Sequence, residues 1–388
     1  MRIGILGAGI GGLALAHRLE QHGVSADVFE RTQTLRALGA GVSLAPQALD
    51  VLSGPTQSRI RSLGSPMRHT TLRSIDGSIL HTGPWPHNAK PNNPTISLLR
   101  AHLQTALVDS LTSTRLTLGK GALDYWPEDD GSVTALFSDG TLASFDVLVC
   151  ADGIWSSASR HIDPQQHVTT HESVVLRGLV PTDVISRATT EGTKEALLWV
   201  GEDRNFLCYP VDSGRQYYVT AYISRNYRGS VDDFSCASGR SDAIEAFNSD
   251  DPAIGQILAG VSICEYRPSF YRTKPRAVNK GFLVGLGDSI GAIPSHSAQG
   301  ATSAIITAGW LGDAIAASKF DRNQLVSNLY KFNSVSTKHL SAVYDYATAV
   351  ASHYFRADFE TIGEKVKVLN SLITEHGAHL ARVRGTST

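Results

Sequence analysis

The glycine-rich segment near the N-terminus constrains the fold of this chain more than any other feature. Residues 2–7 form a short apolar run typical of a buried strand, and a helix-like pattern follows over residues 11–22. In such a segment one glycine permits a tight turn, one lets the backbone approach a pyrophosphate, and one lets the helix pack on the strand. The helix N-terminus also offers unpaired N–H groups to phosphates. We therefore predict dinucleotide contacts from Gly7, Gly9, Ile10, Gly11 and Gly12.

A second apolar run completes a β-α-β unit. It is expected as a strand over residues 24–30 and ends at Glu30, 18 residues beyond Gly12. An acidic residue at this place can accept hydrogen bonds from ribose hydroxyls. Glu30 and the adjacent Arg31 are therefore predicted as further cofactor contacts. This unit alone does not distinguish FAD from NAD.

Composition and charge argue against several other classes. Lys and Arg number 35 and Asp and Glu 36 in 388 residues, without long runs of one sign, so neither nucleic acid nor an anionic membrane is an expected partner. No uninterrupted apolar stretch of about 18 residues occurs, and glycines interrupt the N-terminal one early, so a cytoplasmic protein is expected. The four cysteines form no CxxC pair and the 14 histidines no HExxH pattern, so no metal site is predicted. No Ser-His-Asp or Cys-His nucleophile arrangement is apparent, which argues against a hydrolase.

Patterns farther along the chain predict a second domain. Residues 173–225 are rich in β-branched and aromatic residues, which favours a separate antiparallel sheet. Six prolines between residues 50 and 98 predict a segment in which regular structure is broken. A long helix is expected from about Ser297 to Ala317, and two or three helices over residues 323–380.

Two later motifs each follow a buried apolar run. Asp152-Gly153 follows one run, and Gly287-Asp288 follows another, with Gln299 eleven residues beyond Asp288. Together with the glycine segment, in this order and at these separations, the motifs resemble the class A flavoprotein aromatic hydroxylases. Among these, they resemble the salicylate hydroxylase and 6-hydroxynicotinate 3-monooxygenase branch. The resemblance covers about residues 1–320.

This resemblance implies an α/β fold. It comprises a Rossmann-like FAD-binding domain of the GR2 type with a β-meander, a substrate domain with an antiparallel sheet, and C-terminal helices. Because three distant motifs must meet at one cofactor, the FAD-binding domain is expected to be discontinuous. The expected boundaries are 1–70, 98–165 and 278–325 for the FAD-binding domain, 71–97 and 166–277 for the substrate domain, and 326–388 for the C-terminal helical region. The C-terminal region is expected to pack on the FAD-binding domain or on a second subunit, as in a homodimer.

The resemblance also implies which residues contact FAD. In the family the glycine segment binds the ADP part, the Asp-Gly motif lies near the pyrophosphate and the nicotinamide path, and the Gly-Asp motif contacts the ribityl chain. Arg36 and a Gly-Ala-Gly segment ending before Val42 match a family segment beside the flavin, and Arg100 matches an FAD-contacting arginine. Beyond the β-α-β unit, the implied FAD contacts are Gly41, Val42, Arg100, Asp152, Gly153, Gly287, Asp288, Gln299, Gly300 and Ala301.

The implied activity is a monooxygenation. NADH or NADPH reduces FAD, O2 adds at flavin C4a to give a hydroperoxide, and a small aromatic or polycyclic substrate attacks its distal oxygen and is hydroxylated or epoxidised. The protein supplies a dry pocket and often a base. Our candidate catalytic residues are His296, Tyr209 and Arg204. Strand alternation places Tyr218 and Tyr222 on one face, without showing whether that face lines the pocket.

Departures from the family pattern keep other functions open. Ser289-Ile290-Gly291 replaces the usual Ala-Ala-His, and Ile306-Thr307 replaces an acidic pair. Ser43 and Asn205 stand where the 6-hydroxynicotinate branch has catalytic histidines. The alternatives are an FAD-dependent oxidase, reductase or cyclase without oxygen insertion, an NAD-dependent dehydrogenase without flavin, and a nucleotide-binding protein without catalysis.

Overall fold

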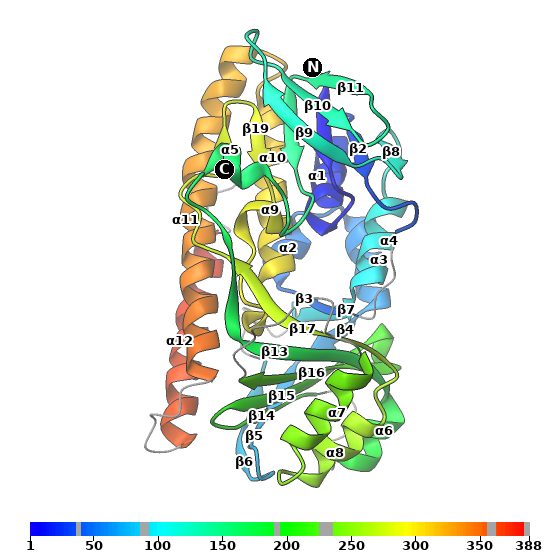
Figure 1. The fold of residues 1–388 in the computed structure, drawn as a ribbon, viewed down its shortest axis with the longest axis vertical. Helices are drawn as coiled ribbons and strands as arrows, with labels where there is room; N and C mark the ends of the chain where they lie inside the picture. Colours follow the sequence, from blue (N-terminus) through cyan, green and yellow to red (C-terminus); the bar gives the residue numbers. More distant parts are fainter. Residues whose placement is uncertain (36–39, 86–92, 190–194, 225–235, 355–361, 384–388) are drawn as a thin grey trace.

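In the computed structural model, the two largest sheets are stacked along the long axis of the molecule (Figure 1). The structure describes the whole chain except residues 36–39, 86–92, 190–194, 225–235, 355–361 and 384–388. Two long antiparallel strands, β13 (Val168–Pro181) and β17 (Ile263–Arg272), belong to the lower sheet and connect it to the upper part. The chain therefore passes from one layer to the other more than once.

The upper sheet has six strands in the order β18-β19-β12-β1-β2-β8. β1 runs parallel to β2 and β12, and β12 runs parallel to β19, so the carboxyl ends of these strands lie at one edge. All four residues of β1 and of β12 are buried, as is typical of a parallel sheet covered on both faces. The strands are β1 (Ile3–Leu6), β2 (Asp27–Glu30), β8 (Arg115–Leu118), β12 (Val147–Cys150), β18 (Asn279–Lys280) and β19 (Leu283–Gly285).

Helices and a small antiparallel sheet complete this upper layer. The expected helix after the glycine segment is α1, and it packs against the long helix α10, which begins at Gly300. The expected β-meander is present as three antiparallel strands in the order β11-β10-β9. The elements are α1 (Ile10–Gln21), α4 (Arg100–Asp109), β9 (Ala122–Pro127), β10 (Val133–Phe137), β11 (Leu142–Phe145), α5 (Ala158–Ile162), α9 (Asp288–Gly291) and α10 (Gly300–Ala317).

The lower sheet has seven strands in the order β17-β13-β16-β15-β14-β5-β6. Its outer face packs on short helices through a buried core that includes Trp199, Phe206 and Phe247. Its other face turns toward the upper layer (Figure 1). The remaining elements are β5 (His69–Ser74), β6 (Ile79–Pro84), β14 (Ala196–Val200), β15 (Arg204–Val211), β16 (Gln216–Ser224), α6 (Thr182–Ala188), α7 (Cys236–Ala246) and α8 (Pro252–Ala259).

The expectation that residues 50–98 lack regular structure is wrong for their described part. Pro55 lies in the first turn of a helix, where the missing N–H would have no intrahelical partner. Pro66 lies in an edge strand, and Pro84 is the last residue of β6, so neither interrupts the interior of a ladder. Besides β5 and β6, this segment contains α3 (Gly54–Leu63), β4 (Ser65–Met67) and β7 (Thr95–Leu99). It is preceded by β3 (Gly41–Leu44) and α2 (Pro46–Asp50), and β3, β7 and β4 form a small sheet.

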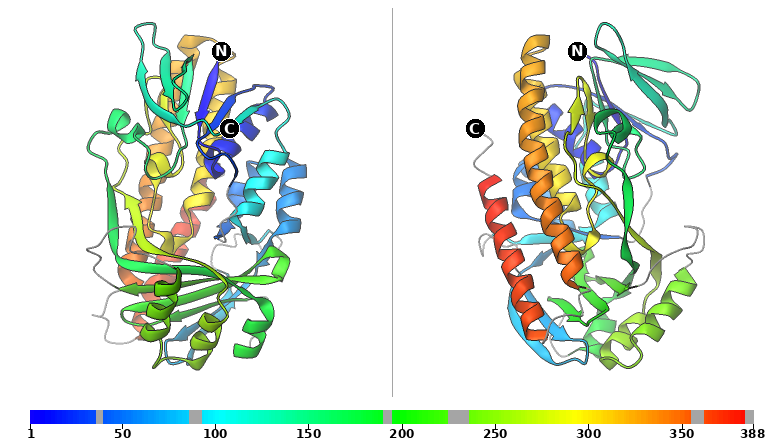
Figure 2. Two further views of the ribbon diagram at one scale, coloured as in Figure 1. Left: turned by 45° about the vertical axis from the view of Figure 1, so that its right-hand side comes forward. Right: turned by 60° about the vertical axis from the view of Figure 1, so that its left-hand side comes forward.

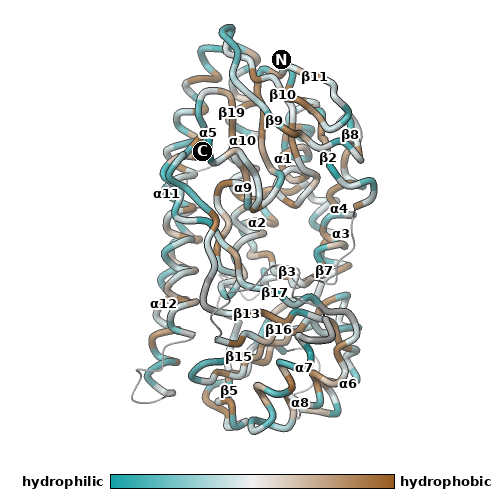
Figure 3. Tube along the Cα trace, in the orientation of Figure 1, coloured by the Kyte–Doolittle hydropathy of each residue, from teal (hydrophilic) through white to brown (hydrophobic). Residues whose placement is uncertain are grey.

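Two C-terminal helices run along the side of the molecule (Figures 1 and 2). α11 (Arg322–Tyr354) alternates hydrophilic and hydrophobic residues along its length (Figure 3) and packs on α10. α12 (Ile362–Val383) reaches both layers, because Val366 packs with Val200 of the lower sheet while Leu380 joins the upper core. The tail thus packs on its own chain. Within the described ranges, no helix is both long and apolar enough to cross a membrane.

The contact between α11 and α12 contains a pair of histidines. Nδ1 of His339 lies 3.1 Å from Nε2 of His379, so one ring must donate and the other accept. His339 is 2% exposed, and this burial, with a smaller effect of His379, lowers its pKa to about 3. Folding therefore requires a neutral His339, whereas the unfolded chain takes up a proton below about pH 6.5.

We expect acid to weaken the fold through His339. Because its folded-state pKa is depressed, the free energy of unfolding should fall as pH drops from about 6.5 toward 3, by at most ~1.4 kcal/mol per pH unit from this group. In His339→Phe the decrease should be smaller. Urea unfolding at several pH values measures the free energy of unfolding, and His69→Phe, at an exposed histidine, is the control. Equal pH profiles for wild type and His339→Phe would contradict the assignment.

Candidate active site

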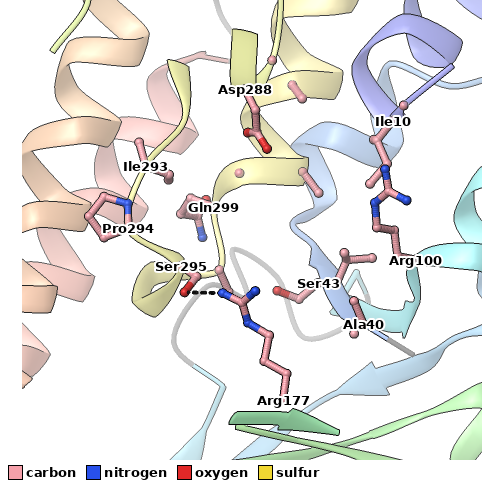
Figure 4. A pocket seen from close by; sticks show the side chains of 18 of the residues that line it. Ile10, Ala40, Ser43, Arg100, Arg177, Asp288, Ile293, Pro294, Ser295 and Gln299 are labelled. Atoms are coloured by element: carbon pink, nitrogen blue, oxygen red, sulfur yellow. Dashed lines mark hydrogen bonds between the residues drawn. The ribbon is translucent and has the colours of Figure 1, made fainter. Parts of the chain in front are cut away.

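A cavity of about 350 Å³ lies where the two layers meet. Asp288 and Arg100 enter it from the upper layer, whereas Arg177 rises from β13 below (Figure 4). Gly7, Gly12, Glu30, Arg31, Asp152 and Arg204 do not line it. The predicted site residues that do line it are Gly9, Ile10, Gly11, Gly41, Val42, Arg100, Gly153, Tyr209, Gly287, Asp288, His296, Gln299, Gly300 and Ala301. Arg36 lies outside the described residues.

The glycines of the first motif have different steric roles. A Cβ on Gly7, whose φ is +103°, would lie 2.4 Å from the Ala151 carbonyl oxygen, and one on Gly12 would lie 2.1 Å from the Gly7 carbonyl oxygen. The backbone of the protein therefore leaves no room for a side chain at either position. A Cβ on Gly9 would instead find its nearest atoms at 3.8 Å and 3.9 Å, on Ala151 and Arg100. Gly9 thus leaves open space in front of the α1 N-terminus.

Glu30 lies beside the glycine turn. Its carboxylate accepts hydrogen bonds from the Ala8 N–H at 3.0 Å and from the Thr32 N–H at 3.0 Å. Gln104 of α4 donates to the Ala8 carbonyl at 2.6 Å, so the turn is held from both sides. Arg31 is exposed and borders a separate surface hollow with Thr32.

Two carboxyl groups of the later motifs lie at the same edge of the upper sheet. Asp288 is exposed toward the cavity but surrounded by protein elsewhere, and this surrounding raises its pKa, against the effects of Arg100 and Arg272. Burial likewise raises the pKa of Asp152. Arg272 was not predicted from the sequence. It is 3% exposed and donates to the Ile154 and Ser156 carbonyls at 2.6 Å and 2.7 Å, which holds the Asp-Gly turn.

The segment between α9 and α10 forms one wall of the cavity. A short 3₁₀ turn, η3 (Ser295–Ser297), precedes Ala298, which adopts a left-handed φ of +53° that is unusual for a residue other than glycine. Gln299 and Gly300 then line the cavity where α10 begins. Unpaired N–H groups and the helix dipole favour negative charge at this end.

The floor of the cavity is the inward face of the lower sheet. Strand pairing places Arg177 beside Thr220, which in turn pairs with Leu207. The same face carries Tyr218 and Tyr222, as strand alternation predicts, and Tyr217 points into the outer core. The floor residues that the sequence did not single out as site residues are Arg177, Leu207 and Thr220. Strand periodicity alone could not find them because the register is not readable from it.

Two of the three predicted catalytic residues lie in this cavity. His296 is 7% exposed, and its ring centroid lies 4.2 Å from that of Tyr222. Tyr209 packs against Tyr218, and burial holds the pKa values of both phenols well above 10. Both tyrosines therefore remain protonated near neutral pH and can donate hydrogen bonds.

Arg204 does not reach the cavity, which corrects its placement among the catalytic candidates. Its guanidinium donates to both Asp250 oxygens at 2.7 Å and 2.8 Å, and also to Asp203. Asp250 is only 5% exposed, so this ion pair ties β15 to the segment after α7. Arg204 therefore has a structural role. Its sequence neighbours gave no indication of Asp250 as a partner.

The cavity fits the FAD that the sequence motifs imply. Gly9 leaves space at a helix N-terminus for a pyrophosphate, and Asp288 presents a carboxylate that can accept from ribityl hydroxyls. Glu30 lies at the end of β2, where ribose hydroxyls are bound in such folds. The small residues Gly300 and Ala301 leave room at the start of α10.

Two substitutions should separate folding from FAD binding. Gly9→Ala has room in the protein but fills the space for the pyrophosphate, so the chain should fold normally and bind FAD at least about tenfold more weakly. Gly12→Ala should destabilise the fold itself, because its Cβ clashes with backbone. Flavin titration and thermal unfolding measure the two effects. Gly255→Ala, with open space in α8, is the control, and unchanged FAD affinity in Gly9→Ala would refute the assignment.

Comparisons with known proteins agree with this geometry. The model of the family "FAD binding domain" matches residues 1–320. The chain is 28% identical over 311 residues to 3-amino-4-hydroxybenzoate 2-monooxygenase of Streptomyces cremeus, covering 79% of this chain and 76% of that protein. It is 25% identical over 340 residues to 6-hydroxynicotinate 3-monooxygenase of Pseudomonas fluorescens, covering 86% and 87%.

Solved structures show the same fold. HpxO of Klebsiella pneumoniae, complexed with FAD and uric acid, has a TM-score of 0.82 at 20% identity over 99% of this chain and 95% of that one. A salicylate hydroxylase substrate complex also has a TM-score of 0.82 at 20% identity, over 99% and 97%. The chain belongs to the FAD binding domain family and is an FAD-dependent monooxygenase of the aromatic-hydroxylase type.

Proposed function

We propose that this protein uses NADH or NADPH and O2 to hydroxylate a small aromatic substrate in the cavity between its two layers. The observation that carries this proposal is the meeting of the three motif segments with a floor of tyrosines in one cavity. The motif segments supply an FAD site, and the floor supplies a largely apolar surface for a planar ring. The relatives named for aromatic substrates support this reading.

Bound FAD would supply the electron transfer and oxygen activation, and the residues of the chain would hold and shape the reactants. Gly9, Asp288 and the start of α10 would bind the cofactor. Tyr209 and Tyr218 can donate hydrogen bonds to a bound substrate and would exclude water, and their raised pKa values make them unsuitable as bases near neutral pH. His296 is therefore our proposed proton acceptor for a substrate hydroxyl.

The alternative without oxygen insertion loses its motivation in the structure. It rests on Ser289 and on Ile306-Thr307, which depart from the family pattern. Ser289 is fully buried, and its hydroxyl donates to the Cys150 carbonyl at 2.5 Å. Ile306 and Thr307 are each 2% exposed inside α10. These residues serve packing and do not line the cavity, so they give no reason to expect different chemistry.

Isotope tracing tests the proposal. Holoenzyme should oxidise NADH or NADPH faster when a suitable phenol is present, and mass spectrometry should find one atom from ¹⁸O2 in the product. Phenols, hydroxybenzoates and hydroxyquinolines form a suitable first panel. A product that lacks the label, or that takes it from labelled water, would contradict oxygen insertion. Gel filtration tests whether the protein also forms the homodimer that the sequence left open.

Replacement of His296 tests the proposed base. His296→Gln should retain FAD but lower kcat by roughly 10²-fold, because general-base catalysis contributes about 10²–10⁴ in rate. Tyr209→Phe should affect KM more than kcat, since it removes only a hydrogen-bond donor. Steady-state kinetics with each variant separates the two roles. An unchanged kcat in His296→Gln would exclude it as the base.

A further inference from the structure

We propose that Arg177 anchors an anionic group, a carboxylate, on the aromatic substrate. This inference rests on the proposed function, since it names the class of substrate that the same cavity selects. It assigns the negative group of that substrate to the floor of the cavity, at the end opposite Asp288 (Figure 4).

The position of Arg177 follows from strand register. It lies on β13 between Glu265 of β17 and Thr220 of β16, and all three side chains share one face of the sheet. Its Nη2 donates to Ser295 Oγ at 3.0 Å, and its Nη1 lies 3.4 Å from Glu265 Oε2. The side chain is 22% exposed, and it lines the cavity.

The charges around Arg177 do not cancel. Glu265 also forms an ion pair with Arg267 through its other oxygen, so one carboxylate serves two guanidinium groups. This trio carries one net positive charge. Arg267 is 45% exposed, so water solvates and screens its charge, whereas Arg177 points into the cavity. Nearby phenols do not compensate, because burial keeps Tyr218 protonated. A partly desolvated cation of this kind is stabilised by an anion that hydrogen-bonds to it.

The surroundings of Arg177 suit a carboxylate attached to a ring. The hydroxyl of Tyr222 lies 3.3 Å from Ser295 Oγ, so two hydroxyl groups adjoin the guanidinium and can turn to donate. Leu207 and Tyr209 provide apolar surface on the same floor. A ring could pack there while its carboxylate meets Arg177. An arginine pairs well with a carboxylate because its N–H groups match the two oxygens.

Matched pairs of ligands test this inference. The 2-, 3- and 4-hydroxybenzoates and the corresponding hydroxybenzamides have nearly the same shape, but only the acids are anionic, and both can be titrated into holoenzyme by flavin absorbance. At least one acid should bind wild type roughly 10- to 100-fold more tightly than its amide. Arg177→Met should remove that preference and Arg177→Lys should retain part of it. As a control, Arg215→Met removes a positive charge from a side chain that is 71% exposed, and this variant should keep the preference for the acid.

A second variant should strengthen the binding of carboxylates instead of weakening it. Glu265→Gln removes the carboxylate that competes for Arg177, so hydroxybenzoates should bind more tightly and hydroxybenzamides should be unaffected. This variant keeps the test decisive if Arg177→Met fails to fold. The inference is overturned if wild type binds no acid more tightly than its amide, or if Arg177→Met preserves the preference.

The same titrations separate this inference from the proposed function. If neutral phenols are hydroxylated with ¹⁸O while acids show no Arg177-dependent preference, the anchor is wrong and the monooxygenase stands. If acids bind through Arg177 but no labelled oxygen enters any product, the anchor stands and the proposed function fails. Circular dichroism and flavin content for each variant show that binding is compared between folded holoenzymes.

Discussion

The parallel pairing of β1, β12 and β19 is the constraint on which the site depends. Their carboxyl ends lie at one sheet edge, so the segments after them meet although they are separated by well over one hundred residues in the sequence. Buried apolar side chains fix this pairing, and Gly7 and Gly12 allow the turn and the close helix approach that it requires. Without this alignment no single cofactor could contact all three motifs.

The second half of the site depends on strands that connect the layers. β13 and β17 run together from the upper part into the lower sheet, and Arg272 at the end of β17 holds the Asp-Gly turn while Arg177 on β13 enters the cavity. A pair of strands thus positions both the cofactor edge and the floor. α12 contacts both layers as well, so the spacing between cofactor and substrate surfaces is supported at the side of the molecule.

Local patterns made the fold and the cofactor motifs readable from sequence. Glycine spacing, apolar strands and helical periodicity act over a few residues, and their prediction agrees with the β-α-β unit, the β-meander and α10. The long C-terminal helices were also expected. The prolines of residues 50–98 led to a wrong prediction, because proline disrupts a helix or strand only in its interior. Pro55 lies at the start of a helix, Pro66 in an edge strand and Pro84 at the end of a strand.

The sequence by itself determined a dinucleotide-binding β-α-β unit, because the residues that such a cofactor requires are marked by type and spacing, and the resemblance of its three motifs to the flavoprotein hydroxylases implied FAD. The tertiary structure decided what faces the cofactor. Arg177 forms a hydrogen bond with Ser295, which lies 118 residues farther along the chain. Arg204 instead binds Asp250, 46 residues farther along, and therefore does not reach the cavity. These outcomes depend on strand register and on which face of the sheet turns inward. A one-residue shift of β13 would turn Arg177 away from the cavity, and a one-residue shift of β15 would turn Arg204 toward it. No short-range pattern fixes either register.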